Sequence, residues 1–177
     1  MELVYLALGA NLGDPLAQIA AALEALEAPD LRVERRARIY RSAPVGPPGQ
    51  PDYLNSAIEV RTALEPLALL DRVKAVEAEL GRTAGVRWGP RVIDIDLALY
   101  GDREVDHARL RIPHAQLVHR AFVLAPLADL CPSRRVPGTE HTIAELLERL
   151  NPPPEELSVL DAPPWTPSSR ADRPAGG

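Results

Sequence analysis

Residues 92–100 read Val-Ile-Asp-Ile-Asp-Leu-Ala-Leu-Tyr, a stretch with the alternation of a β-strand. Alternate side chains of a strand share one face, about 6.5–7 Å apart along the chain. Asp94 and Asp96 are therefore expected to point the same way, followed by Ala98. The apolar residues expected on the opposite face are Ile93, Ile95, Leu97 and Leu99. This strand supplies both a core face and a pair of neighbouring carboxylates.

The segments that precede this strand alternate between strand and helix patterns. Strands are expected at 3–8, 32–40 and 53–62, and helices from Pro15 to about residue 28 and from Pro66 to about Leu80. Asp14 suits the N-cap of the first helix, because Pro15 fits its first position. With the strand at 92–100 the order is β-α-β-β-α-β. This order predicts an α+β fold of the ferredoxin-like βαββαβ sandwich type, an antiparallel-containing sheet with both helices on one face.

The remaining chain is expected to form a C-terminal extension and a tail. After Gly101 we expect a small hairpin, short helices near 115–130 and a helix from Thr142 to Leu150. The last 27 residues contain seven prolines. We therefore expect residues 1–150 to form the functional domain and residues 151–177 to be a Pro-rich, poorly packed tail.

Length and composition limit the class of protein. The chain has 177 residues, 46% of them hydrophobic, which suits one globular domain with a sizeable core. The net charge of −5 argues against a general nucleic-acid or membrane-surface binder. No apolar run approaches a membrane span, and no secretory signal is evident. The single cysteine, Cys131, excludes a disulfide framework, so we expect a cytoplasmic protein.

The Asp pair predicts a cation site. Two carboxylates side by side repel each other and lose hydration unless a cation lies between them. Hard oxygen ligands suit Mg²⁺, which takes the rest of its shell from water and substrate phosphates. Arg87 and Arg91 lie just upstream, where they could neutralise the same phosphates. The alternative is a structural cluster in which local arginines simply pair with Asp94 and Asp96.

Two further clusters carry aromatic and polar groups. A stiff proline-rich loop at 42–52 leads to Tyr53 and Asn55, which share a strand face and suit a flat heteroaromatic ligand. His114 and Phe122 lie in a later cluster. Each feature alone also fits a structural role, as an edge tyrosine, a turn asparagine, a loop histidine or a core phenylalanine. Together with the Asp pair they provide the groups that a phosphoryl-type transfer to a planar substrate requires.

Five motifs occur in order along the chain, and together they resemble one family. They are Gly9-Ala-Asn-Leu-Gly13, Pro44-Val-Gly-Pro…Gln50-Pro-Asp-Tyr-Leu-Asn55, Leu80-Gly-Arg82, Trp88-Gly-Pro-Arg91-x-x-Asp94-x-Asp96 and Ile112-Pro-His114…Arg120-x-Phe122. From about residue 3 to 150 the chain resembles the 6-hydroxymethyl-7,8-dihydropterin pyrophosphokinases of folate biosynthesis. The resemblance implies a pyrophosphokinase domain at 1–150 that transfers pyrophosphate from ATP to the pterin hydroxymethyl group and releases AMP.

The resemblance also implies a role for particular residues. Arg82, Arg91, Asp94 and Asp96 would be catalytic, and the two aspartates would hold two Mg²⁺ ions. The expected pterin-binding residues are Ser42, Pro44, Val45, Tyr53, Asn55, Trp88 and Phe122. The expected nucleotide-binding residues are Lys74, Glu77, Arg87, Leu97, Arg109, Arg111, His114 and Arg120.

Other classes of protein share some of these features. A glycosyltransferase also uses an Asp-x-Asp pair to hold a nucleotide's metal, but such enzymes need a larger domain. A ferredoxin-like small-ligand-binding module without catalysis is the main alternative. An RNA-recognition module would want basic charge and aromatic residues on its central strands, whereas this chain has a net negative charge and only five Tyr and Phe residues in all. We therefore expect small-molecule substrates, no nucleic-acid or membrane partner, and a monomer.

Overall fold

The computed structural model describes residues 1–82 and 89–160, and its main feature is a six-stranded sheet. The sheet strands are β1 (Glu2–Ala10), β2 (Leu31–Arg36), β3 (Tyr40–Ser42), β4 (Tyr53–Thr62), β5 (Asp94–Tyr100) and β8 (Leu157–Val159). Their order is β5-β1-β4-β3-β8, with β2 also paired to β4, and every pairing is antiparallel. A separate hairpin joins β6 (Val105–His107) to β7 (Leu110–Ile112).

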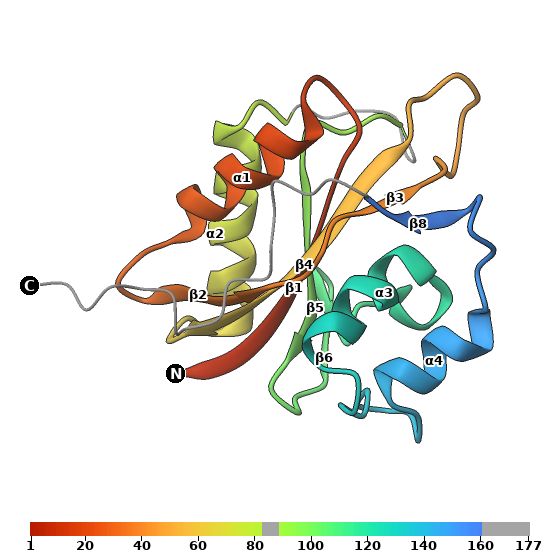
Figure 1. Ribbon diagram of the computed structural model, residues 1–177. Helices are drawn as coiled ribbons and strands as arrows, with labels where there is room; N and C mark the ends of the chain where they lie inside the picture. The colour runs from red at the N-terminus through yellow and green to blue at the C-terminus, as the bar shows by residue number, and fades with distance from the viewer. Residues whose placement is uncertain (83–88, 161–177) are drawn as a thin grey trace, which may run out of the picture.

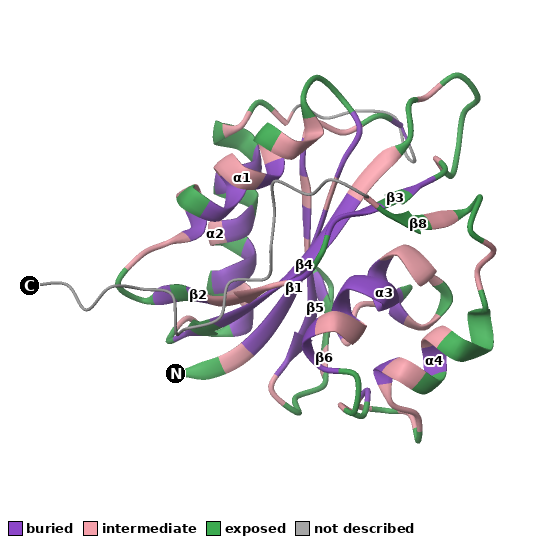
Figure 2. Ribbon diagram, in the orientation of Figure 1, coloured by how far each residue is buried: buried purple, intermediate pink, exposed green. Residues whose placement is uncertain are grey.

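Helices cover both faces of this sheet. The helices are α1 (Pro15–Leu26), α2 (Pro66–Glu79), α3 (Ala121–Leu130) and α4 (Ile143–Leu150), with a short 3₁₀ helix at Leu117–His119. Helices α1 and α2 pack on one face, and α3 and α4 on the other (Figure 1). Each face carries its own apolar cluster, so the central strands are buried on both sides (Figure 2). The expected α+β class with an antiparallel sheet is confirmed. In the described ranges, no helix combines the length and apolarity that crossing a membrane requires.

The helix ends follow the expected chemistry. Asp14 caps α1, where its Oδ1 accepts a hydrogen bond from the Ala17 amide at 3.1 Å. Helix α4 begins with a capping box in which Thr142 and Glu145 satisfy each other's backbone amides. Strand β4 has the predicted bounds, and α2 ends one residue before the expected limit.

Two of the expected strands contain register shifts. The single strand expected at 32–40 is divided into β2 and β3 by residues 37–39, and β2 itself has a register shift between Val33 and Arg35. In β5 the partners of Tyr5 and Leu6 are Leu99 and Leu97, so Ala98 is the extra residue of a bulge. A bulge reverses the faces of all side chains beyond it. Leu99 therefore packs in the cluster beneath α3, on the face opposite the one expected.

The structure also differs from the expected tail. Strand β8 lies within residues 151–177, yet it pairs with β3 along its whole length. Three residues are too few to show the alternation of apolar and polar side chains that indicates a strand. The prolines on either side of β8 indicate a loop instead, so this strand cannot be recognised in the sequence. The packed part of the chain therefore extends at least to Leu160. Residues 161–177 lie outside the described residues.

A buried carboxylate beneath α3 predicts acid sensitivity. Glu59 accepts hydrogen bonds from Tyr5 at 2.9 Å and from Arg35 at 3.0 and 2.6 Å. Burial raises the pKa of Glu59, but the hydrogen bonds from Arg35 and Tyr5 outweigh it and leave that pKa below its usual value. A lowered folded-state pKa stabilises the protein above the unfolded-state pKa of ~4.3, and this contribution is lost as pH falls through the folded-state value.

We therefore expect the free energy of unfolding to fall more steeply below pH ~4.3 in wild type than in Glu59→Gln. Urea unfolding at a series of pH values would measure both slopes. Glu24→Gln, a change in an exposed carboxylate of α1, is the control. Parallel curves for wild type and Glu59→Gln would contradict the expectation.

Candidate active site

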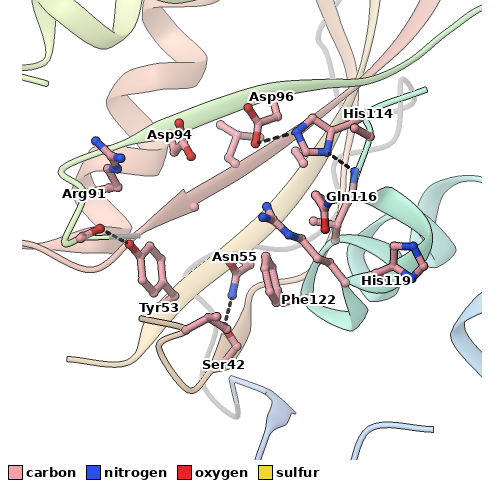
Figure 3. A pocket seen from close by; sticks show the side chains of 18 of the residues that line it. Ser42, Tyr53, Asn55, Arg91, Asp94, Asp96, His114, Gln116, His119 and Phe122 are labelled. Atoms are coloured by element: carbon pink, nitrogen blue, oxygen red, sulfur yellow. Dashed lines mark hydrogen bonds and ion pairs between the residues drawn. The ribbon is translucent and has the colours of Figure 1, made fainter. Parts of the chain in front are cut away.

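A cleft of about 640 Å³ opens beside the ends of β1, β4 and β5. The side chains that line it come from four regions far apart in the sequence, and Figure 3 shows them converging on one space. Its polar and aromatic lining residues are Ser42, Tyr53, Asn55, Lys74, Arg82, Arg91, Asp94, Asp96, His114, Gln116, His119, Arg120 and Phe122. The lining therefore combines charged side chains around the Asp pair with the aromatic rings of Tyr53 and Phe122 and the side-chain amide of Asn55.

The two aspartates lie together on β5, as the alternation predicts. Each side chain is 34% exposed to solvent, and both line the cleft. Arg82 Nη1 lies 2.6 Å from Asp94 Oδ1, and His114 Nε2 lies 3.9 Å from Asp96 Oδ2 (Figure 3 shows the second pair). Burial, followed by the charge of Asp94, raises the pKa of Asp96. The Asp96 carboxylate thus carries an electrostatic cost that a bound cation would relieve.

The donor set of this pair fits Mg²⁺. Within residues 1–82 and 89–160, no group of three or more His, Cys, Asp or Glu side chains is arranged to hold a metal. Magnesium rarely uses an all-protein cage and instead binds through one or two carboxylates plus water and phosphate oxygens. Two adjacent carboxylates open to a cleft are therefore the kind of site that Mg²⁺ takes together with a phosphorylated substrate.

Glu77 lies beneath the cleft rather than in its lining. Its side chain is buried, and its Oε1 accepts a hydrogen bond of 2.7 Å from the Ile95 amide. Lys74 Nζ lies 2.9 Å and Arg82 Nη1 2.5 Å from Glu77 Oε2. Burial raises the pKa of Glu77 in spite of these cations. Glu77 therefore joins α2 to β5 between the two aspartates and holds Arg82 beside Asp94.

The aromatic wall begins at the start of β4. The Tyr53 hydroxyl donates to the Gly89 carbonyl at 2.9 Å, and Asn55 Nδ2 donates to Ser42 Oγ at 2.8 Å (Figure 3). Gly9 is the β1 partner of Asn55, and a Cβ there would lie 3.3 Å from Asn55 Oδ1. Glycine at this position leaves space around the amide oxygen.

Further lining residues come from the segment before α3 and from the first turn of α3. The Arg120 guanidinium lies over the Phe122 ring, 5.7 Å from its centroid. His114 Nδ1 accepts a hydrogen bond from the backbone N–H of Gln116 at 3.3 Å, which leaves the His114 Nε2 turned towards Asp96. His119 and Gln116 also line the cleft, and the sequence analysis missed them. They lie in and next to a short 3₁₀ turn, which has no periodic signal.

Asn11 is a further residue that the sequence analysis did not single out. It is buried, and its Oδ1 accepts a hydrogen bond from the Arg91 amide at 2.8 Å. Its Nδ2 donates to Gln50 Oε1 at 3.3 Å and to the Pro51 carbonyl at 3.1 Å. Asn11 thus joins the Arg91 segment to the proline-rich loop. The only signal was its place in the Gly-x-Asn-Leu-Gly motif.

Several expected site residues lie elsewhere. Leu97 belongs to the apolar core, and Pro44 does not line the described cleft. Arg109 pairs with Asp71, and Arg111 Nη2 lies 3.5 Å from Asp106 Oδ1, both outside the described cleft lining. Trp88 and Arg87 lie outside the described residues. The cleft unites the other expected residues, except Glu77 beneath it.

Comparisons with known proteins point to one family. The family model described as 7,8-dihydro-6-hydroxymethylpterin-pyrophosphokinase (HPPK) matches residues 5–132. A 2-amino-4-hydroxy-6-hydroxymethyldihydropteridine pyrophosphokinase of Pseudomonas aeruginosa is 46% identical over 148 residues, which cover 83% of this chain and 91% of that relative. The enzyme of the same name from Methylorubrum extorquens is 44% identical over 153 residues, covering 86% and 96%.

Solved structures resemble the fold at much lower identity. An HPPK-DHPS in complex with substrates matches with a TM-score of 0.69 and 14% identity. A Plasmodium falciparum HPPK-DHPS matches with a TM-score of 0.64 and 16% identity. In both cases 84% of this chain is covered, but this chain spans only 43% of the solved one. These likenesses support the fold alone.

Proposed function

The chain belongs to the 7,8-dihydro-6-hydroxymethylpterin-pyrophosphokinase family, and from this premise we propose that it transfers the pyrophosphoryl group of ATP to 6-hydroxymethyl-7,8-dihydropterin in folate biosynthesis. The products are AMP and the pterin pyrophosphate. The observation that carries the proposal is one cleft with an Asp pair on one wall and an aromatic, amide-bearing wall on the other. A triphosphate and a flat heterocycle need these two kinds of wall side by side.

The acidic and basic wall would bind the triphosphate. Two Mg²⁺ ions held by Asp94 and Asp96 would neutralise phosphate charge and favour ionisation of the attacking hydroxyl. Arg82, Arg91 and Arg120 line the same cleft and would stabilise charge on the transferred group and on the leaving AMP. His114 and Lys74 would bind further phosphate or nucleotide oxygens.

The aromatic wall would bind the pterin. Tyr53 and Phe122 present rings to the cleft, and stacking on a planar heterocycle is favourable for such rings. Asn55 would read the pterin edge through its Oδ1, because its Nδ2 already donates to Ser42 Oγ and to the Tyr40 carbonyl. Val45 would cover the outer side of the ring. With both substrates held, the main contribution of the protein is alignment of the hydroxyl with the β-phosphorus.

We further propose that the fold is the ferredoxin-like βαββαβ sandwich. The sheet order β5-β1-β4-β2, all antiparallel, supports this, as does the placement of α1 and α2 on one face. Helices α3 and α4 then form an added layer. Monomeric state and cytoplasmic location remain predictions from the sequence.

The direct test is AMP release from ATP and Mg²⁺, with and without 6-hydroxymethyl-7,8-dihydropterin. We expect AMP only when both Mg²⁺ and the pterin are present. Arg120→Ala, in the cleft, is expected to lower kcat/KM by about 10²-fold, because it removes one charge from the phosphate wall. Arg103→Ala removes an exposed arginine paired with Glu65 and is the control. No AMP from folded wild-type protein would overturn the assignment, and pterin binding without AMP would identify a non-catalytic binding module.

A further inference from the structure

Strand β8 pairs with β3, which carries Ser42 of the cleft lining, although no residue of β8 lines the cleft itself. Its Leu157, Ser158 and Val159 pair with Ser42, Arg41 and Tyr40 of β3. Two backbone hydrogen bonds extend the pairing at its ends, from Ala43 N to Glu156 O at 3.3 Å and from Leu160 N to Ile39 O at 3.0 Å. Figure 1 shows β8 alongside β3 at the edge of the sheet.

Strand β3 holds two groups of the pterin wall in place. It is three residues long and ends at Ser42, whose Oγ accepts the hydrogen bond from Asn55 Nδ2. Ser42 and Asn55 are 5% and 4% exposed, and both line the cleft. The orientation of the Asn55 amide therefore depends on the position of β3. The proline-rich loop that follows Ser42 has no regular structure of its own.

A strand this short needs support on both edges. Strand β4 pairs with one edge of β3, and β8 pairs with the other. An unpaired edge strand of three residues makes few hydrogen bonds and opens locally at low cost. Strand β8 is itself fixed at its end by Leu160, which packs against the main apolar cluster. The segment that holds β3 is thus anchored in the core.

We propose that β8 is a positioning strand for the pterin subsite: by pairing with β3 it fixes Ser42, and through Ser42 the Asn55 amide that reads the pterin edge. The inference rests on the proposed function, since it concerns the pterin subsite of that same cleft. Its consequence is selective. Loosening β8 weakens pterin binding, whereas the phosphate wall on β5 and α2 keeps its geometry.

The test uses Ser158→Pro in the full-length chain. Ser158 is exposed and lies opposite Arg41 in the middle of β8. Proline removes the backbone donor there, and Ser158→Ala keeps it and is the matched control. We expect KM for the pterin to rise about tenfold, the effect of one misplaced polar contact, with KM for ATP within about twofold of wild type. Leu160→Ala is a milder second variant, with an expected rise of about threefold.

Direct titration separates this inference from the proposed reaction. Calorimetry with the pterin, Mg²⁺ and a non-hydrolysable ATP analogue measures the pterin Kd in wild type and in each variant. If wild type releases no AMP, the proposed reaction fails, and the Kd values still decide the role of β8. A selective rise in pterin KM and Kd supports the positioning role. Unchanged pterin values, or an equal rise for both substrates in protein with a lower Tm, would overturn it.

Discussion

Asp96→Asn is expected to lower kcat by about 10³-fold while leaving the protein no less stable than wild type. The activity falls because asparagine is a poor ligand for Mg²⁺ and adds no negative charge to the site. Stability does not fall with it, since burial and the nearby charge of Asp94 raise the pKa of Asp96. A raised pKa means that the folded protein favours the neutral form, so a neutral amide removes an unfavourable charge.

Metal linkage gives this prediction a readout that does not depend on turnover. A ligand that binds only the folded state raises Tm, so Mg²⁺ with an ATP analogue should raise the Tm of wild type but not of Asp96→Asn. In EDTA the variant should melt at or above the wild-type temperature. Asp102→Asn, a change in an exposed carboxylate outside the cleft lining, is the control. A variant that melts well below wild type in EDTA would show that Asp96 is a structural member of the sheet instead.

The sequence was sufficient for the elements that have a clear period. The alternation in β5 predicted that Asp94 and Asp96 share a face, and the capping residues predicted the start of α1. The bulge at Ala98 could not be predicted, because a bulge depends on how β1 pairs with β5 and not on either pattern alone. The same holds for β8, whose three residues carry no signal until β3 lies beside them.

The candidate site could be predicted to the level of its chemistry but not of its contacts. Tyr53, Asn55 and the Asp pair, which the motifs contain, all line one cleft. Each of them lies on a strand, and the fold determines the direction of that strand. Long side chains near a site were less predictable. Arg109 and Arg111 reach exposed aspartates outside the described cleft lining, because a flexible guanidinium takes the nearest carboxylate that tertiary structure offers.

Glu77 shows best how a residue expected to bind substrate contributes from beneath the site. Its carboxylate accepts from the Ile95 amide and lies against Lys74 and Arg82, all between α2 and β5. We expect Glu77→Leu to lower the free energy of unfolding by about 3 kcal/mol, because a buried amide and a partly buried guanidinium lose a partner. For a chain of this length that corresponds to a fall in Tm of roughly 6–12 °C.

Glu77→Gln separates the two contributions to this loss. Glutamine keeps an acceptor for the Ile95 amide but removes the charge that faces Lys74 and Arg82. Because burial raises the pKa of Glu77, the charged form is costly here, and we expect Gln to lose less than half of what Leu loses. Glu79→Gln, two residues further along α2, is the control for a change of charge alone. Thermal melts of the three variants measure the ranking. Equal losses for Gln and Leu would show instead that the ion pairs, rather than the hydrogen bond to β5, hold this side of the cleft together.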